Sequence, residues 1–463
     1  MTAVKEKIKN WRVPHSLAII FVMMVMAAVL TYLIPAGEYT RVKLESGQTV
    51  VDPTSFHYVE SNPVNPLSVI GLVFEGLNKA KSVIFVLLCA GGGMGIVLAT
   101  GMFQSLASMI GKKAKGKEWI VISVVMTLFA LLCIPVNLNF FIPFAPMGVL
   151  IAASLGLDAI VGIGIIMLGG AVGFSCGAMN ISNTGTAQII AELPLFSGMG
   201  YRLLCMIPFL AVAIIYVLRY AKKCKLDSKN SLLYGVELEN VAYQEKEYPE
   251  LSIKDAPMLI AFIAGLGLMT YLAIQRKLTN ELTATIFMYM GLVCGIANRM
   301  NVNDICKKFM DGVKSMATTS MMIGFAYVIS VILSKGNVMD TVVYGFSNML
   351  GVFPKIIQAP IMLIMHIIIN FFVTSGSGQA AVTMPIFIPV ADIVGISRQT
   401  AVLAFNFGDG FCNNILPHAA ATMGFVGIAG IPFSKWFKFS LKLFLYWVVV
   451  GAVLLMIAQS IGY

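Results

Sequence analysis

Two interruptions of apolar sequence between residues 370 and 418 constrain this chain more than any other feature. The region reads NFFVTSGSGQAAVTMPIFIPVADIVGISRQTAVLAFNFGDGFCNNILPH, with polar, glycine-rich breaks at 374–379 and 408–414. Hydropathy places both breaks inside a membrane, where lipid cannot satisfy the backbone groups that a helix break releases. Such backbone is tolerated only where it is buried in protein or lines a cavity. In secondary transporters that cavity holds the substrate and the coupling ion, so the pattern predicts a transporter.

The composition is that of an all-α polytopic membrane protein. Of the 463 residues, 58% are hydrophobic and 12% are charged. In a soluble domain about a quarter of the residues are charged. Apolar runs long enough to cross the roughly 30 Å hydrocarbon layer recur from end to end. The net charge of +10 comes largely from lysines in short loops beside apolar runs, as in cytoplasmic loops. We therefore expect a multi-pass protein of the cell membrane whose partner is the lipid bilayer and not nucleic acid.

Basic residues set the expected orientation of the first half. Four of them between positions 5 and 12 place the N-terminus in the cytoplasm. The apolar run at 16–35 lacks a small-residue cleavage site, so we predict a retained first helix rather than a signal peptide. The turn-rich loop at 35–66 then lies outside, and KKAKGK at 112–117 lies inside. The GGGMG cluster at 91–95 predicts close helix packing.

Two further interruptions occur in this half. PVNLN at 135–139 separates two apolar arms within 119–155. The arms fit either two full spans or a re-entrant hairpin, and both remain open. The next apolar segment begins at Asp158, a predicted helix N-cap, and is broken by NISNTGT at 180–186.

The two halves of the chain repeat one pattern. A polar linker at 226–255, predicted to be cytoplasmic, separates a first unit at 1–225 from a second at 256–463. Three short matches occur in the same order in both units: 96–107 with 331–342, 139–141 with 370–372, and 182–183 with 413–414. Tracing the charges through the second unit gives it the opposite orientation. We predict an inverted repeat with paired helix breaks, which is typical of alternating-access transporters.

The motifs FFVTSGSGQAAVTMP at 371–385 and LAFNFGDGF at 403–411 resemble the YfcC family of basic amino-acid antiporters. That family lies within the C4-dicarboxylate anaerobic carrier group, which is similar to the ion transporter superfamily. The resemblance implies two re-entrant hairpins, two broken transmembrane helices, and a homodimer whose scaffold supports elevator-like motion.

Two departures from the family bear on the substrate. Relatives often carry paired glutamates at the first hairpin tip, but no acid lies between Glu118 and Asp158, and the tip offers only Asn137 and Asn139. Where relatives commonly have a basic residue after Phe-Ala, this chain has Tyr327. A carboxylate is the natural partner of a guanidinium group, so a small amino acid or carboxylate is the preferred substrate. An arginine/ornithine-type antiporter and a C4-dicarboxylate carrier remain alternatives.

Hydroxyl, amide and free backbone groups at the four interruptions form the candidate substrate and ion site. Helix N-termini after a break suit a carboxylate, and freed carbonyls suit Na⁺, so one site could hold a zwitterion. The simpler alternative is that these residues only cap broken helices. The candidates are Asn137, Asn139, Asn180, Ser182, Asn183, Thr184, Thr374, Ser375, Gly376, Ser377, Gly378, Gln379, Asp409, Asn413, Asn414 and His418.

Asp409 is the sharpest single candidate. An acid at bilayer depth costs roughly 2.5 to 3.5 kcal/mol on insertion scales. It is predicted to be a cation ligand, a proton carrier or the partner of a substrate ammonium group, and the alternative is a structural cap. Na⁺ or H⁺ is the expected coupling ion, with Na⁺ at Ser182, Asn183, Ser375, Ser377 and Asp409. His418 could titrate near neutral pH or could simply be hydrogen-bonded.

Other functional classes find little support. The eight cysteines form no CxxC pair, no His/Cys/Glu spacing suggests a metal site, and no GxxxxGK[ST] motif exists. We therefore expect no cofactor and no ATPase activity. Ser375 or Ser377 with His418 is the only nucleophile and base that an intramembrane hydrolase could use. We predict a transporter rather than an enzyme, with an ion channel and this hydrolase as the rival classes.

Overall fold

The computed structural model describes residues 16–43, 49–52, 54–113, 116–236, 252, 255–275, 277–350 and 352–463. Within these residues nine helices are long and apolar enough to cross a membrane. They are Pro66–Ala99, Ala159–Cys176, Met199–Leu226, Ala256–Ile274, Asn280–Ala297, Val302–Lys335, Lys355–Phe372, Gly376–Val394 and Phe433–Ser460. The expectation of a helical, multi-pass membrane protein is confirmed. The N-terminal basic residues and most of the linker lie outside the described residues.

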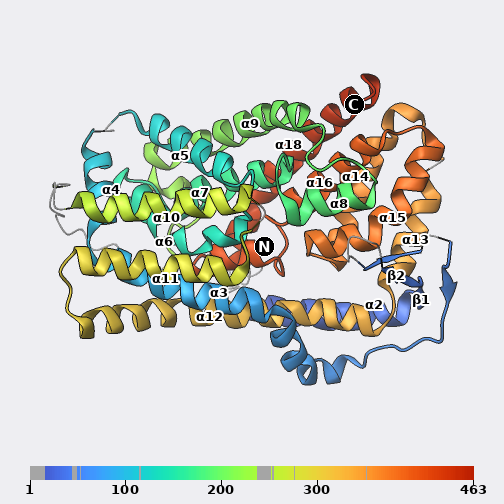
Figure 1. Cartoon of the computed structure of the whole chain (residues 1–463), viewed down its shortest axis with the longest axis horizontal. Coiled ribbons are helices and arrows are strands. Elements are labelled where there is room, and N and C mark those ends of the chain that lie inside the picture. Colours follow the sequence, from blue (N-terminus) through green and yellow to red (C-terminus); the bar gives the residue numbers. More distant parts are fainter. Residues whose placement is uncertain are drawn as a thin grey trace, which may run out of the picture.

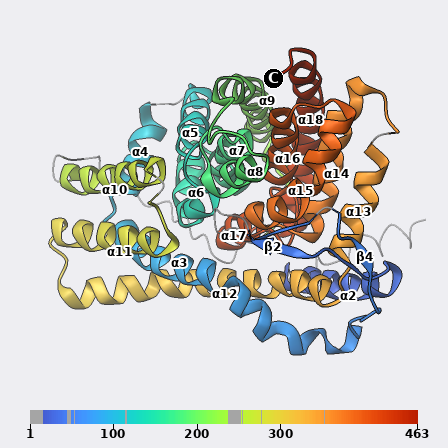
Figure 2. The same ribbon diagram turned by 45° about the vertical axis from the view of Figure 1, so that its right-hand side comes forward.

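Five helices form what we name the first bundle: α2 (Ser16–Leu33), α3 (Val73–Ala99), α10 (Ala256–Ile274), α11 (Asn280–Ala297) and α12 (Val302–Lys335). Figures 1 and 2 show α2, α3, α11 and α12 along the lower edge of the molecule. Glycines let these backbones approach closely. A Cβ added at Gly93 would lie 2.1 Å from the carbonyl oxygen of Phe287, and one at Gly91 would lie 3.1 Å from that of Gly312. The packing role predicted for the GGGMG cluster is confirmed.

A further set of helices forms the second bundle, which lies mostly above α2, α3, α11 and α12 in both views. It contains α5 (Glu118–Leu132), α6 (Ala145–Ser154), α7 (Ala159–Cys176), α8 (Thr186–Ile190), α9 (Met199–Leu226), α14 (Lys355–Phe372), α15 (Gly376–Val394), α16 (Arg398–Cys412), α17 (Ala420–Ile428) and α18 (Phe433–Ser460). Helix α7 is buried along its whole length, which explains why its sequence is apolar on every face. Asp158 caps it, as predicted, by accepting a hydrogen bond from the Val161 amide at 3.1 Å.

Four interruptions divide helices of the second bundle. Between α5 and α6 the chain unwinds at 133–137 and then forms the 3₁₀ segment η2 (Leu138–Phe144); between α14 and α15 it unwinds at 373–375. Helix α7 ends before 177–180, followed by the π-helical η3 (Ile181–Gly185) and α8, and α16 ends before 413–419, followed by α17. An interruption therefore occurs near each predicted position.

The limits of three breaks differ from the prediction. Residues 376–379 belong to α15, residues 408–412 belong to α16, and residues 181–186 belong to η3 and the start of α8. The reason is clearest in α16, where glycines serve close packing instead of unwinding the backbone. A Cβ at Gly408 would lie 2.5 Å from that of His366, and one at Gly410 would lie 2.3 Å from the Ser175 hydroxyl. Asp409 consequently lies in the last turn of a helix, and not in an unwound segment.

Short elements complete the described fold. Strand β1 (Gly37–Glu38) pairs antiparallel with β4 (His57–Tyr58), and β2 (Arg41–Lys43) pairs with β3 (Thr49–Val51). The 3₁₀ segments η1 (Pro66–Leu72) and η4 (Ser228–Asn230) precede α3 and follow α9, and helices α4 (Met102–Lys113) and α13 (Met339–Leu350) link the bundles. Arg41 forms an ion pair with Asp340 of α13 at 2.8 Å. These contacts fasten the strand region to the side of the second bundle.

Candidate functional site

The four interruptions of the second bundle surround one small cavity, which we name the central cavity. Its volume is about 130 Å³. The predicted candidates that line it are Asn137, Asn139, Ser182, Asn183, Thr374, Ser375, Gly376, Ser377 and Asn413. These residues come from widely separated parts of the sequence, so the fold brings the predicted interruptions together.

Ends of several helical segments meet at the central cavity. Gly376 and Ser377 open α15, Ala420 and Ala421 open α17, and Leu138 and Asn139 open η2. Helix N-termini carry free N–H groups and partial positive charge, which favour an anionic group. Gly410 and Asn413 bring the C-terminal end of α16 to the same cavity, where helix carbonyls favour a cation. The arrangement can therefore hold opposite charges side by side.

Side-chain caps hold the interruptions in place. Ser375 caps α15 through a hydrogen bond from the Gly378 amide at 3.4 Å. Asn137 caps η2 by accepting from the Asn139 amide at 3.0 Å. Asn180 accepts from the Ser182 hydroxyl at 2.9 Å and from the Asn183 amide at 3.1 Å. These residues line or border the cavity and also cap helices, so the two roles considered for them are compatible.

Asp409 lies behind the wall of the central cavity and is fully buried. Its Oδ2 accepts a hydrogen bond from the side-chain amide of Asn183. This contact joins the interruption after α7 to α16. The Oδ1 of Asp409 is buried and receives no hydrogen bond of ordinary geometry, although the Asn413 side chain lies beside the carboxylate. An unmatched carboxylate oxygen in a protein interior is costly, so its position calls for a ligand or a proton.

The other candidates lie away from the central cavity. The Gln379 side-chain amide donates to the His366 carbonyl at 3.1 Å, and the His418 ring contacts the Phe371 carbonyl at 2.9 Å. Asn414 bonds within its own turn to the Phe411 carbonyl at 3.1 Å. Thr184 and Gly378 also lie outside the cavity lining. These contacts favour a structural role for Gln379, Asn414 and His418.

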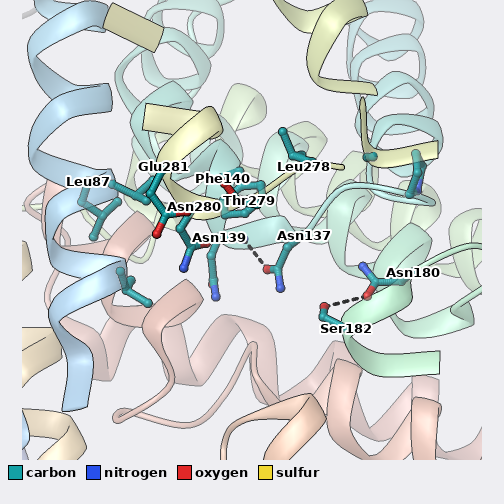
Figure 3. A pocket seen from close by; sticks show the side chains of 14 residues that line it. Leu87, Asn137, Asn139, Phe140, Asn180, Ser182, Leu278, Thr279, Asn280 and Glu281 are labelled. Atoms are coloured by element: carbon teal, nitrogen blue, oxygen red, sulfur yellow. Dashed lines mark hydrogen bonds between the residues drawn. The ribbon is translucent and has the colours of Figure 1, made fainter. Parts of the chain in front are cut away.

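A second cavity adjoins the first, and we name it the side cavity (Figure 3). Its volume is about 440 Å³. One wall comes from the first bundle, including Leu87 of α3 and Glu281 at the start of α11. The opposite wall contains Asn137, Asn139 and Ser182, which also line the central cavity. The side cavity therefore lies between the bundles and ends at the candidate site.

Three buried polar residues near the site are absent from the predicted set: Arg202, Asn406 and Asn370. Arg202 begins an apolar run at 201–218, where an arginine is commonly interfacial, yet here it is fully buried. Its Nη1 donates to Asn406 Oδ1 at 2.5 Å, and Asn406 donates to Asn183 Oδ1. The sequence signal that could have identified Arg202 is a charge inside an apolar run. The signal for Asn406 is its position three residues before Asp409, on the same helix face.

Comparisons with the sequences of known proteins agree with the sequence motifs. The family model of the C4-dicarboxylate anaerobic carriers (DcuC) matches residues 13–460. A protein of Escherichia coli (strain K12), named "Putative basic amino acid antiporter YfcC", is 30% identical over 512 residues, covering 100% of both chains. An uncharacterized protein of Haemophilus influenzae (strain ATCC 51907 / DSM 11121 / KW20 / Rd) is 25% identical over 510 residues, covering 100% of this chain and 99% of its own.

Solved structures of two transporters also match. The Alcanivorax borkumensis YdaH transporter has a TM-score of 0.45 and 16% identity, covering 97% of this chain and 99% of its own. Neisseria gonorrhoeae MtrF, described as illuminating a class of antimetabolite efflux pumps, has a TM-score of 0.45 and 14% identity, covering 96% of this chain and 95% of its own.

The family resemblance seen in the sequence motifs is confirmed by the match along the whole chain: this protein belongs to the C4-dicarboxylate anaerobic carrier family.

Proposed function

We propose that this membrane protein is an ion-coupled secondary transporter of a small amino acid or carboxylate, working by alternating access. The four interruptions act as two opposed re-entrant hairpins and two broken transmembrane helices of an inverted repeat. The substrate binds in the central cavity, and Na⁺ or H⁺ symport or exchange drives the cycle. The N-terminus is cytoplasmic, the membrane is the cell membrane, and two copies of the chain form a homodimer.

The observation that carries this proposal is the convergence of helix ends on the central cavity. Its described lining contains hydroxyls, amides and the first residues of α15, α17 and η2, and it includes no aspartate, glutamate, lysine or arginine. Helix N-termini and neutral donors favour a carboxylate. A dibasic amino acid needs, in addition, a carboxylate for its side chain. The lining therefore supports a carboxylate-bearing solute of low positive charge over arginine or ornithine.

The position of the side cavity supports the proposal that the substrate site moves with the second bundle. The central cavity is lined by the second bundle except for Tyr327 of α12, whereas the side cavity has one wall from each bundle. A site carried mostly by one body can change its exposure when that body slides along the other, which is a rigid-body form of alternating access. We propose that the first bundle is the scaffold and that the second bundle carries the substrate.

The test is counterflow by the purified full-length chain in proteoliposomes. Arginine, ornithine, citrulline, neutral amino acids and dicarboxylates are compared, each with and without a Na⁺ gradient. We expect saturable exchange of one carboxylate-bearing solute, with a smaller signal for dibasic amino acids. Absence of exchange for every solute would contradict the transport proposal, as would single-channel currents in a planar bilayer. Product formation that is lost in Ser377→Ala, without any uptake, would indicate the hydrolase instead.

Gly376→Ala is expected to raise the half-saturating concentration of the exchanged solute by about tenfold. A Cβ at Gly376 would lie 3.0 Å from Asp409 Oδ2 and 3.3 Å from Asn183 Nδ2, so this hydrogen-bonded pair must shift. Small displacements within a site can cost up to about 100-fold in activity. The measurement is the concentration dependence of counterflow.

Gly378→Ala is the matched control, because it adds the same methyl group to the same turn of α15. There the three atoms nearest to the new Cβ would belong to Ser375 and Val373, at 3.2 to 3.6 Å. Its half-saturating concentration should stay within about threefold of the original protein. Equal effects of the two substitutions would show that strain in the helix, and not the Asp409–Asn183 pair, sets the affinity.

A further inference from the structure

Arg202 of α9 is a buried cation without a direct counter-charge. It is fully buried, and its Nη1 donates to Asn406 Oδ1 at 2.5 Å and to the Cys176 carbonyl at 3.5 Å. Its Nε and Nη2 make no hydrogen bond of ordinary geometry, although the Tyr463 side chain lies beside the guanidinium group, and none of the ion pairs among the described residues includes it. A buried charge without compensation is strongly destabilising. The negative charge that balances the Arg202 guanidinium group must therefore come from a residue farther away.

Two amides connect Arg202 to Asp409. Arg202 donates to Asn406, Asn406 donates through its amide nitrogen to Asn183, and Asn183 donates to Asp409 Oδ2. All four side chains are fully buried. The chain joins three separate helical elements, because Arg202 belongs to α9, Asn183 to η3, and both Asn406 and Asp409 to α16.

The chemistry of its two ends fixes the direction of this chain. A guanidinium group can only donate hydrogen bonds, and an ionised carboxylate can only accept them. Each amide therefore turns its oxygen toward Arg202 and its nitrogen toward Asp409, which is the arrangement that the contacts describe. Hydrogen bonds aligned in this way polarise one another in a low-dielectric interior. The positive charge at one end thus stabilises the negative charge at the other.

Asp409 Oδ1 is left as an available acceptor at the other end. It is buried and receives no hydrogen bond of ordinary geometry, although the Asn413 side chain lies beside the carboxylate. The Oδ1 of Asn370 is also buried without a donor, while its amide nitrogen donates to the Asp409 carbonyl at 3.0 Å and to Asn413 Oδ1 at 3.3 Å. Unfilled oxygen acceptors on residues linked by hydrogen bonds, at a helix C-terminus, suit a hard monovalent cation.

We infer that Arg202 is the remote counter-charge of Asp409, which it holds as an anion through Asn406 and Asn183, so that Asp409 Oδ1 and Asn370 Oδ1 bind Na⁺. Arg202 and Asn406 are positioning residues, because they act through Asn183 and touch neither the ion nor the central cavity. This assignment deepens the proposed transport function and rests on it for its meaning. It selects a metal cation, and not a proton, as the coupling ion.

The test measures Na⁺ binding by the purified full-length chain, as the rise in unfolding temperature with NaCl relative to choline chloride. We expect saturable stabilisation of the original protein. Arg202→Gln should weaken the apparent Na⁺ affinity by at least about tenfold, about 1.4 kcal/mol, and Asp409→Asn should remove the Na⁺ response. Arg202→Lys keeps the charge and should stay closer to the original affinity than Arg202→Gln, which a purely structural role would not produce.

The double variant Arg202→Gln with Asp409→Asn tests the coupling itself. Each single change leaves one buried charge without its partner, whereas the double change removes both. We expect the double variant to unfold at a higher temperature than either single variant, although it no longer responds to Na⁺. This expectation holds even if Arg202→Gln alone fails to fold. Additive destabilisation, or a double variant that also fails to fold, would overturn the inference.

Arg398→Gln is the matched control. Arg398 is at the other end of α16, and it forms ion pairs with Glu192 at 2.8 Å and with Asp392 at 2.9 Å. Its loss should leave the Na⁺ affinity unchanged. Equal Na⁺ and choline responses of the original protein, or a response to pH alone, would refute the sodium site. Because no transported solute is needed, failure of the counterflow assay would leave this result intact and would refute only the transport function.

Discussion

Asp409→Asn is expected to lower counterflow uptake by at least about 100-fold, equivalent to about 2.8 kcal/mol at 1.4 kcal/mol per tenfold. The substitution preserves shape, and the new side-chain oxygen can still accept the hydrogen bond that Asn183 donates. It removes the negative charge next to the central cavity and replaces Oδ1 with an N–H donor, which repels a cation. The protein should therefore fold with reduced stability and transport poorly. The measurement is initial uptake rate, normalised to protein in the vesicles.

Asp392→Asn is the control for loss of an acid from the same half of the chain. Asp392 belongs to α15 and pairs with Arg398 at 2.9 Å, with about 42% of its side chain exposed. An exposed ion pair contributes about 0 to 1 kcal/mol, so uptake should change little. Normal transport by Asp409→Asn at every pH tested would show that Asp409 is a structural cap and not part of ion coupling.

The position of Asp392 also shows where prediction from sequence fails. An acid shortly before a helix start predicts an N-cap, and the sequence predicts this role for Asp392 in the helix that follows it, as it does for Asp158. The structure gives it to Ser397, whose hydroxyl accepts from the Thr400 amide at 3.1 Å. Asp392 lies near the C-terminal end of α15 instead. Two plausible caps five residues apart cannot be ranked without the backbone between them.

The residues of the candidate site could be predicted from the sequence more accurately than the positions at which the helices begin and end. Polar residues inside apolar runs are expensive in a membrane, so Asp409, Asn183 and Ser375 could be selected from composition and spacing alone. Glycine gave a weaker signal, since it can unwind a helix or let two helices touch. Gly408 and Gly410 do the latter, so the predicted break began several residues too early.

Arg202 shows a different limit. Its distance along the chain from Asp409 exceeds 200 residues, and their connection passes through two amides that have no charge of their own. No local pattern pairs an arginine with an acid in this way. The connection exists only after α9, η3 and α16 have packed together. Sequence could identify both charges as unusual, but only the fold shows the hydrogen bonds that connect them.

Gly93→Leu is expected to reduce the yield of monodisperse protein by at least about tenfold. A Cβ at Gly93 would lie 2.1 Å from the carbonyl oxygen of Phe287, on the neighbouring helix α11. A backbone atom cannot move away by changing rotamer, so α3 and α11 must separate. Inserting bulk into a packed interior costs typically about 1 to 3 kcal/mol and occasionally more. The measurement is size-exclusion chromatography of protein extracted from membranes.

Gly267→Leu separates this effect from a general intolerance of leucine in the first bundle. Gly267 of α10 is exposed, and a Cβ there would meet no atom within 4 Å. The added side chain would face lipid, where leucine is favourable by about 0.3 to 0.6 kcal/mol, so the yield should match that of the original protein. If Gly93→Leu were equally well tolerated, α3 and α11 would not be in close contact. A scaffold that loose could not serve as the fixed body against which the second bundle moves.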